Sequence, residues 1–312
     1  MRKWLQKFEP KPAVEPAELT KELFASLMVM AWFVEAKDPY TGGHLWRVSE
    51  YARKLAAAGK LPPADVARIA LGGFLHDLGK IAVSDQVLRK TGKLNDREYE
   101  EIKTHPEAGG RMLAGHPLAN LVGAAVELHH ERPDGKGYPH GLNSSMIPVD
   151  SVIVGICDAF DAMTSQRPYR KPMTKERACN IIAENLDSQF NRFWGELFIH
   201  EVQQGTFDTV LGHSQEGIPL HHCKSCGPVV VQRSDQQAGD FIYCPVCSRE
   251  MRLHEMDSHA HAANCATAFT AKPTGKKGTA IDLEPKADRT LIRSMIERSV
   301  AALPPELLAL KN

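Results

Sequence analysis

The stretch ALGGFLHDLGKI, residues 70–81, places a histidine and an aspartate side by side at the end of an apolar segment. The apolar run and the Pro62-Pro63 pair before it predict a buried helix that ends near Asp77. Two adjacent polar side chains interrupt the apolar pattern there, so they need hydrogen-bonding or ligating partners. One such pair, taken alone, fits a hydrogen-bonded core pair as well as it fits a metal site.

The same arrangement recurs along the chain. Other predicted apolar helices also carry histidine or aspartate, and the further candidates are His44, His105, His129, His130 and Asp158. Because the helices of a bundle can bring their inner ends together, these side chains can converge with His76 and Asp77 on one cavity. Five histidines and two aspartates suffice for two divalent ions. Mixed imidazole and carboxylate ligands suit iron or manganese, and zinc or nickel less selectively.

Two divalent ions are suited to the hydrolysis of a phosphodiester, whose oxygens repel anionic nucleophiles. Ions about 3.5–4 Å apart can hold a bridging hydroxide and the phosphoryl oxygens together. A carboxylate such as Asp77 between the ions would fix that separation. Lys80, Arg167 and Arg170 are natural donors to phosphate. The alternative for each of these three cations is a solvated surface position. We therefore take Asp77 and Lys80 as the candidate catalytic residues.

Helical periodicity dominates residues 18–197, and no alternating strand pattern occurs there. The expected helices include one from His44 to Ala58 and one capped by Asn95 or Asp96. The predicted fold class is an all-α helical bundle followed by a small zinc-stapled module that contains β structure. The expected parts are a flexible tail (1–17), a catalytic domain (18–200), a linker (201–218), a zinc-binding module (219–266), and a linker with a short C-terminal helix (267–312).

The 312-residue chain has 38 basic and 38 acidic residues, so its formal net charge is zero. That balance disfavours broad electrostatic attraction to nucleic acid or to an anionic membrane. The longest apolar run is too short to span a bilayer, and the N-terminus lacks the apolar core of a signal peptide. We therefore expect a cytoplasmic protein. In that reducing compartment, paired cysteines favour metal binding over disulfides.

Two C-x-x-C pairs lie near the C-terminus, separated by 17 residues. Their spacing predicts a tetrahedral four-cysteine site for one zinc ion, formed by Cys223, Cys226, Cys244 and Cys247. A rival set shares the second pair and consists of Cys244, Cys247, Cys265 and either His259 or His261. The four-cysteine set is favoured over the rival set because both of its C-x-x-C pairs have ideal spacing for zinc. Such a module could dock a protein, form a dimer or bind nucleic acid, although the neutral charge disfavours nucleic acid.

Several motifs occur in a fixed order: DPYTGGH at 38–44, HDLGKI at 76–81, KTGKLN at 90–95, HHERPDGKGYP at 129–139, and DAFDAMTSQRPYR at 158–170. Together with His105, these motifs resemble those of the HD-GYP phosphodiesterases, a branch of the HD-domain phosphohydrolases. The resemblance covers about residues 20–197. It is specific because many separate motifs match in the same order.

The resemblance implies an HD fold and hydrolysis of cyclic di-GMP to linear pGpG, or onward to GMP. One ion would be held by His44, His76, Asp77 and Asp158, and the other by Asp77, His105, His129 and His130. Substrate phosphate would be contacted by Lys80, Arg167 and Arg170. The loop formed by Gly137, Tyr138 and Pro139 would lie beside the substrate and could offer a surface to a protein partner.

The residue at one position in the sequence predicts how many ions the centre holds. Family members with three ions carry a glutamate four residues before the first histidine ligand, and Tyr40 stands there in this sequence. We therefore expect two ions. Two alternatives for the function stay open. The same centre could cleave another cyclic dinucleotide, such as cyclic GMP-AMP. The helical region could instead sense a nucleotide without turnover and signal through the zinc module.

Overall fold

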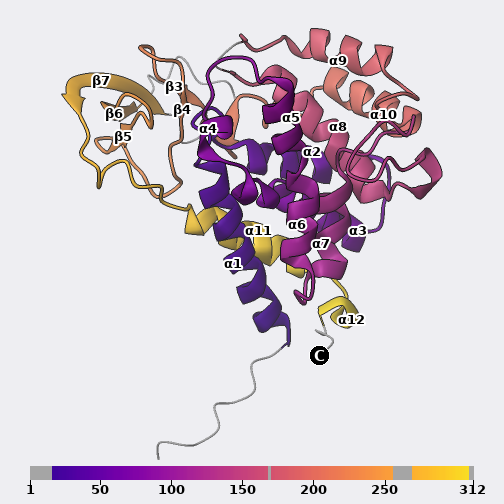
Figure 1. The fold of residues 1–312 in the computed structure, drawn as a ribbon. Coiled ribbons are helices and arrows are strands. Elements are labelled where there is room, and N and C mark those ends of the chain that lie inside the picture. Colours follow the sequence, from indigo (N-terminus) through magenta and orange to yellow (C-terminus); the bar gives the residue numbers. More distant parts are fainter. Residues whose placement is uncertain (1–15, 168–169, 256–268, 309–312) are drawn as a thin grey trace, which may run out of the picture.

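The structure, a computed structural model, describes residues 16–167, 170–255 and 269–308. Within these ranges the chain forms a helical body and a smaller module that contains short strands (Figure 1). This architecture agrees with the fold class that the sequence predicts. The predicted tail, residues 1–17, lies outside the described residues except for its last two, with which the first helix begins.

The helical body is built from helices joined by short loops. Their bounds are α1 (Pro16–Glu35), α2 (His44–Ala58), α3 (Pro63–Leu75), η2 (Leu78–Ala82), α4 (Asp85–Leu88), α5 (Asp96–Lys103), α6 (His105–Leu113), α7 (Ala119–Leu128), η3 (Ser144–Met146), α8 (Val149–Thr164), α9 (Lys175–Glu184) and α10 (Arg192–Gln203). The bounds of α2 are the predicted ones. Asn95 caps α5, because its side chain accepts a hydrogen bond from the backbone N–H of Glu98 at 2.9 Å.

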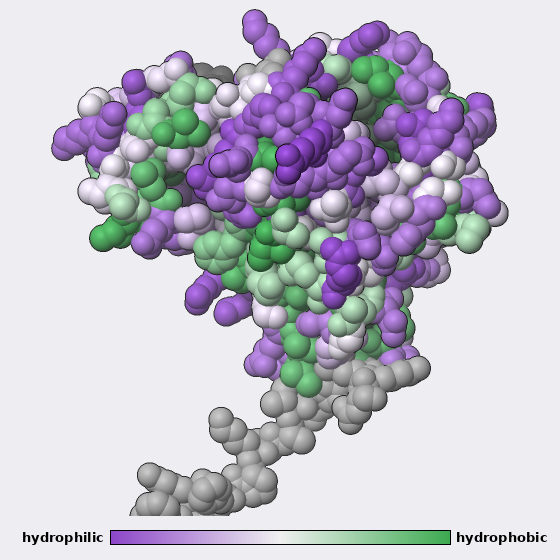
Figure 2. All heavy atoms as spheres, viewed as in Figure 1, coloured by the Kyte–Doolittle hydropathy of each residue, from purple (hydrophilic) through white to green (hydrophobic). Residues whose placement is uncertain are grey.

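The surface of the molecule is mostly hydrophilic in the view of Figure 2, and hydrophobic residues gather over the lower centre of this face, where α1 lies. The exposed apolar side chains of α1 include Leu19, Met30 and Phe33. No helix among the described residues combines the length and apolar character needed to cross a membrane.

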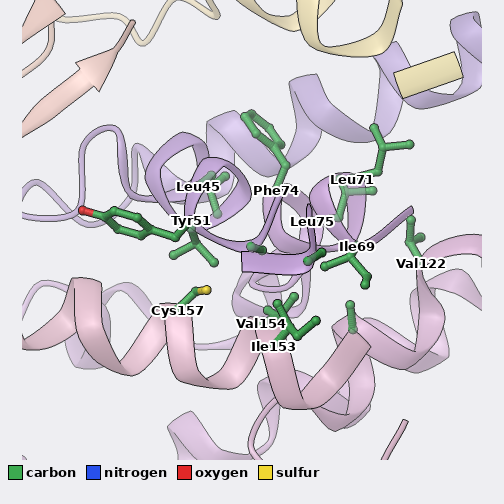
Figure 3. Packing of buried hydrophobic residues seen from close by; sticks show 14 of the residues in the cluster. Leu45, Tyr51, Ile69, Leu71, Phe74, Leu75, Val122, Ile153, Val154 and Cys157 are labelled. Carbon is green, nitrogen blue, oxygen red and sulfur yellow. The ribbon is translucent and has the colours of Figure 1, made fainter. Parts of the chain in front are cut away.

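The core of the body lies between α2, α3, α7 and α8, whose apolar side chains meet at the centre (Figure 3). Full burial of a leucine, isoleucine or phenylalanine side chain contributes about 1.5–3 kcal/mol, and this cluster contains many of them. The candidate histidines and aspartates stand mainly at the ends of these packed helices. The core therefore fixes where those polar side chains point.

The C-terminal module consists of short antiparallel strands. Their bounds are β1 (His213–Gln215), β2 (Ile218–Pro219), β3 (His221–His222), β4 (Val229–Val230), β5 (Phe241–Tyr243), β6 (Arg249–Glu255) and β7 (Phe269–Lys277). β1 pairs with β2, β3 pairs with β4, and β6 lies between β5 and β7. A small apolar cluster that includes Val230, Ile242 and Leu253 forms the module's own core.

Two segments that we expected to be linkers contain regular structure. Residues 201–218 include the end of α10 and most of the β1–β2 hairpin, and residues 267–288 include β7, which pairs with β6. The sequence FTAKPTGKK of β7 lacks an alternating apolar pattern. Its strand conformation is stabilised by hydrogen bonds to β6, which local sequence does not reveal.

The chain returns from the module to the helical body through α11 (Arg289–Val300) and α12 (Pro305–Leu308). Ile292, Met295 and Ile296 of α11 belong to the same apolar cluster as the body, and α11 lies beside α1 (Figure 1). The C-terminal helix predicted from the sequence is therefore part of the main core. Both ends of the module are thereby attached to the helical body.

Candidate metal centre

The seven predicted ligands come from different helices and lie together. His44 begins α2, and His76 and Asp77 follow the end of α3. His105 begins α6, His129 and His130 follow α7, and Asp158 lies within α8. Side chains that are more than a hundred residues apart in sequence thus meet in one place.

The first group of side chains surrounds the Oδ2 atom of Asp77. The Nε2 atoms of His44 and His76 lie 3.5 and 3.4 Å from this oxygen and 3.3 Å from each other. The Oδ1 atom of Asp158 lies 3.4 Å from Nε2 of His44 and 3.8 Å from Nε2 of His76. These four residues match the set that the resemblance assigns to one ion.

The second group lies on the other side of Asp77. Nε2 of His105 is 3.4 Å from Oδ1 of Asp77 and 3.2 Å from Nε2 of His129. The ring of His130 lies 4.1 Å from that of His129 and 5.1 Å from that of His105, measured between centroids. Suitable ligand atoms of these three histidines lie within 4.8 Å of one another. Asp77 therefore directs one carboxylate oxygen toward each group.

The backbone fixes the tautomers of three histidines. Nδ1 of His76 donates to the carbonyl of Gly73 at 2.7 Å. Nδ1 of His105 donates to Ile102 at 2.8 Å, and Nδ1 of His129 donates to the carbonyls of Ala125 and Val126, both at 3.0 Å. A neutral imidazole that donates through Nδ1 carries its lone pair on Nε2, and all three Nε2 atoms point into the centre.

The charge states of the histidines fit a cation. Burial lowers the pKa of His76, lowers that of His105 to about 3 and that of His130 to about 4, and places that of His129 well below its usual value. Neutral His105 and His129 therefore turn two lone pairs toward each other across 3.2 Å, with no proton between them. A divalent ion between the two nitrogens would satisfy both, so this donor set fits a metal.

His44 differs from the other histidines. Burial lowers its pKa, but hydrogen bonds to Asp161 and Asp77 outweigh that effect and raise the pKa to about 9. The surrounding carboxylates thus favour positive charge at Nε2 of His44. A divalent ion in the first group would supply that charge in place of the proton.

Lys80 lies one turn after Asp77, in the 3₁₀ helix η2. Its Nζ atom donates to Oδ2 of Asp77 at 2.6 Å. Burial opposes ionisation of Asp77, but the charge of Lys80 and the hydrogen bond from His44 are among the interactions that outweigh it and hold the pKa of this carboxyl well below its usual range. Asp77 is therefore a carboxylate at neutral pH and Lys80 an ammonium group beside it.

Comparison with known proteins agrees with this geometry. The pattern of the HD domain matches residues 28–192, more than half of the chain. The chain belongs to the HD-domain family. This membership confirms the resemblance inferred from the motifs, and the family's site is associated with divalent metals.

Relatives of this HD domain are named as phosphodiesterases. A cyclic di-GMP phosphodiesterase of Thermotoga maritima is 39% identical over 182 residues, which are 58% of this chain and 47% of the relative. The cyclic di-GMP phosphodiesterase response regulator RpfG of Xanthomonas campestris is 41% identical over 155 residues, 49% of this chain and 41% of the relative. The 3'3'-cGAMP-specific phosphodiesterase 3 of Vibrio cholerae is 38% identical over 157 residues, 49% of this chain and 33% of the relative. The chain thus spans less than half the length of each.

Sequence reasoning did not identify Arg47, Asp161 and Glu35, the polar side chains behind the ligands of the HD domain. Asp161 accepts from Nδ1 of His44 at 2.8 Å and binds the Arg47 guanidinium at 2.6 and 3.0 Å. Glu35 accepts from the backbone N–H groups of Gly43 and Leu45 at 3.2 and 2.8 Å. These residues fix the start of α2 and the ring of His44. Asp161 could have been noticed because it lies three residues after Asp158 on one helix.

A cleft of about 410 Å³ opens beside the second histidine group of the HD domain. His129, His130 and Asp158 line its inner end, while the cations Lys103, Arg132 and Lys136 lie among its remaining walls. Its volume falls within the range of about 300–1,000 Å³ that is typical of small-molecule sites. The cleft therefore combines the metal-ligand cluster with positive charge.

The predicted Gly-Tyr-Pro loop lies at this cleft. The ring of Tyr138 stacks on that of His130 with centroids 4.6 Å apart, and the backbone N–H of Tyr138 donates to the carbonyl of His130 at 3.2 Å. Nζ of Lys103 lies over the ring of Tyr138, 5.5 Å from its centroid. Glu131 accepts from the N–H groups of residues 140, 141 and 142, and so holds the loop against the ligand-bearing helix.

The two predicted phosphate-binding arginines differ in their surroundings. Nη1 of Arg167 lies 3.7 Å from Oδ2 of Asp38, on the side of the centre where His44 stands. Nη2 of Arg170 donates to the carbonyl of Ala162 at 2.6 Å, near the end of α8. Neither arginine lines the cleft described above. Their role in substrate binding stays a prediction.

The four cysteines of the C-terminal module also lie together, outside the matched HD domain. Their ligand atoms are within 4.8 Å of one another, and the structure has these cysteines as free thiols. The rival zinc ligands His259, His261 and Cys265 lie outside the described residues. Leu253, which lies between the second cysteine pair and these residues, is in strand β6.

Proposed function

We propose that the HD domain is a metal-dependent phosphodiesterase that hydrolyses cyclic di-GMP to linear pGpG. The observation that carries the proposal is the position of Asp77, with one oxygen toward His44 and His76 and the other toward His105. Such an arrangement suits two divalent ions that share one carboxylate. We propose iron or manganese for this pair, held by the seven residues of the two groups, because imidazole and carboxylate ligands suit these metals.

Two bound ions would supply an activated water and would neutralise charge on the phosphoryl oxygens. The residues of the chain perform the other tasks. Asp77 fixes the separation of the two ligand groups, and the Lys80 ammonium beside it is placed to donate to a phosphate oxygen. Addition of one water breaks one P–O3′ bond of the cyclic substrate, leaving a 3′-hydroxyl and the 5′-phosphate of pGpG.

The cleft supports a dinucleotide as the substrate. A cyclic dinucleotide carries two phosphates and two purine bases, and the cleft offers cations together with the aromatic rings of Tyr99 and Tyr138. The names of the relatives supply the substrate class, since they refer to cyclic di-GMP and to 3'3'-cGAMP. We place cyclic di-GMP first and 3'3'-cGAMP second.

The test is conversion of cyclic di-GMP by the purified chain loaded with iron or manganese under anaerobic conditions. Chromatography should show pGpG as the product, and Asp77→Ala should abolish turnover. Asp96→Ala is a matched control, because this exposed aspartate stands at the start of α5, away from the ligand cluster. The control should keep wild-type activity. Intact cyclic di-GMP after incubation with fully metallated protein would overturn the substrate assignment.

A panel with 3'3'-cGAMP and a simple phosphate monoester separates the closest alternatives. Cleavage of 3'3'-cGAMP at a higher kcat/KM than cyclic di-GMP would transfer the proposal to that substrate. Tight binding of either nucleotide without turnover, at confirmed metal content, would instead identify a nucleotide sensor.

A further inference from the structure

The thiols of the C-terminal module have the spacing of a tetrahedral metal site. Sγ of Cys226 lies 3.6 Å from Sγ of Cys223 and 3.4 Å from Sγ of Cys244, and Sγ of Cys223 lies 3.6 Å from Sγ of Cys247. A tetrahedron with zinc–sulfur bonds of about 2.3 Å has edges of about 3.8 Å. A disulfide would need about 2.05 Å. The four sulfurs therefore surround a point at which one zinc ion fits.

We propose that these four cysteines bind one zinc ion and that the zinc-bound module holds the loop before His44 in its ligand-presenting position. The proposal goes beyond the proposed hydrolase activity and does not depend on it. It concerns a second metal site and the contact between that site and the start of α2.

Strand β4 and Val231, the residue that follows it, connect the cysteine cluster to the loop before His44. Successive side chains of a strand point to opposite faces. Val230 belongs to the small core of the module together with Cys223 and Cys244. Val229 and Val231 face Gly42, because a Cβ atom at Gly42 would lie 3.2 Å from Cγ1 of Val229 and 2.5 Å from Cγ2 of Val231. One strand thus contacts the cysteine cluster on one face and the loop of the HD domain on the other.

A second contact connects the β1–β2 hairpin to the same loop. Nη1 of Arg47 donates to the carbonyls of Gly42 at 3.1 Å and of His213 at 3.0 Å. The remaining nitrogens of this guanidinium bind Asp161, which orients His44. A displacement of the module would therefore disturb both the backbone before His44 and the hydrogen bonds that fix its ring.

The zinc site is tested with Co²⁺ in place of zinc in the whole 312-residue chain. Cobalt held by four thiolates gives strong visible bands and a near-ultraviolet thiolate charge-transfer band, which a centre of imidazole and carboxylate ligands does not give. Wild type should show these bands and Cys226→Ser/Cys247→Ser should lose them. Cys179→Ser, which removes a buried thiol of α9, should retain them. Absence of thiolate bands in wild type, or their persistence in the double variant, overturns the zinc site.

The contact is tested by hydrogen exchange of the backbone amides at residues 41–47. We expect exchange there to become about tenfold faster in the cysteine double variant, because the loop opens more often. Val229→Ala/Val231→Ala should accelerate exchange at residues 41–47 to the same extent while keeping the cobalt bands. If the cysteine double variant fails to fold, this valine double variant still tests the coupling between the module and the loop. Val246→Ala, at an exposed position between two of the cysteines, is the matched control and should leave exchange unchanged. Unchanged exchange at 41–47 in the valine double variant overturns the coupling.

Discussion

The buried carboxylate of Asp161 contacts both His44 and Arg47 on one side of the candidate metal centre. Asp161 accepts from Nδ1 of His44 and from two nitrogens of Arg47, and the side chains of all three residues are almost fully buried. The charge of Arg47 lowers the pKa of Asp161 far below its usual value even though burial opposes it. Asp161 therefore stays ionised and raises the basicity of the imidazole that it orients, which is a common way to strengthen a metal ligand.

Asp161→Asn should weaken metal binding at the first ligand group. Asparagine keeps the shape but loses the charge that supports His44 and balances Arg47, and loss of such a hydrogen-bonding partner typically weakens metal affinity about 10- to 100-fold. Titration of metal-free protein with Mn²⁺ measures the effect. Asp65→Asn, which alters an aspartate paired with Arg68 on α3, serves as the control. Equal affinities of both variants and wild type would refute the role of Asp161.

Lys80→Met should lower turnover without removing the metals. The ammonium group of Lys80 donates to the carboxylate of Asp77 at 2.6 Å, and methionine preserves much of the volume of the lysine side chain. Removal of one preorganised donor to the developing charge typically lowers kcat by about 10²- to 10³-fold. Steady-state kinetics with metal analysis of the same samples measure both quantities. Lys93→Met at an exposed position is the control, and a loss of metal in Lys80→Met would mean that the residue serves the metal site instead.

At the scale of elements, the loop at residues 131–148 depends on a close backbone contact. A Cβ atom at Gly137 would lie 2.4 Å from the backbone nitrogen of Arg132 and 2.6 Å from the carbonyl oxygen of His130. Only glycine permits this approach, and it lets the neighbouring Tyr138 stack on His130. The loop therefore forms a wall of the cleft because a particular residue lacks a side chain.

Gly137→Ala should displace this loop from the HD centre. The added methyl group meets backbone atoms that cannot rotate away, and such overpacking typically destabilises by about 1–3 kcal/mol. We expect a lower denaturation midpoint and a raised KM for cyclic di-GMP. Urea unfolding and kinetics measure these effects. Gly92→Ala is the matched control, because a Cβ atom there meets nothing within 4 Å, and equal behaviour of the two variants would contradict the prediction.

The elements themselves were predictable where local signals are strong. Apolar periodicity predicted both bounds of α2, and a capping residue predicted the start of α5. The sequence singled out the candidate ligands because polar pairs such as His76-Asp77 interrupt apolar helices. Arg47 and β7 were not predictable, since the role of each depends on a partner distant in the sequence. Local patterns report burial and helix ends, whereas hydrogen-bonded partners and sheet pairing require the three-dimensional structure.

At the scale of the whole molecule, the two candidate metal sites have different structural roles. The HD centre draws its ligands from α2, the end of α3, α6, the end of α7 and α8, so it connects elements that the apolar core already holds together. The cysteine site lies in a module that has a small core of its own. Helix α10 precedes this module in the chain and α11 follows it, so both ends of the module are attached to the helical body. Metal at the HD centre should therefore stabilise the main cooperative unit of the molecule.

Adding Mn²⁺ to metal-depleted protein should raise its unfolding temperature. A ligand that binds only the folded state stabilises by about 4 kcal/mol when its concentration is a thousand times its Kd. The buried lone pairs of His105 and His129, which face each other across 3.2 Å, would then share a cation. Thermal unfolding with and without Mn²⁺ measures the shift. Asp77→Ala should lose most of it, because this variant removes the shared carboxylate, whereas Cys226→Ser/Cys247→Ser should retain it. An equal shift in Asp77→Ala and wild type would mean that Mn²⁺ stabilises the protein from another site, and the seven-residue centre would lose its role as the metal site of the fold.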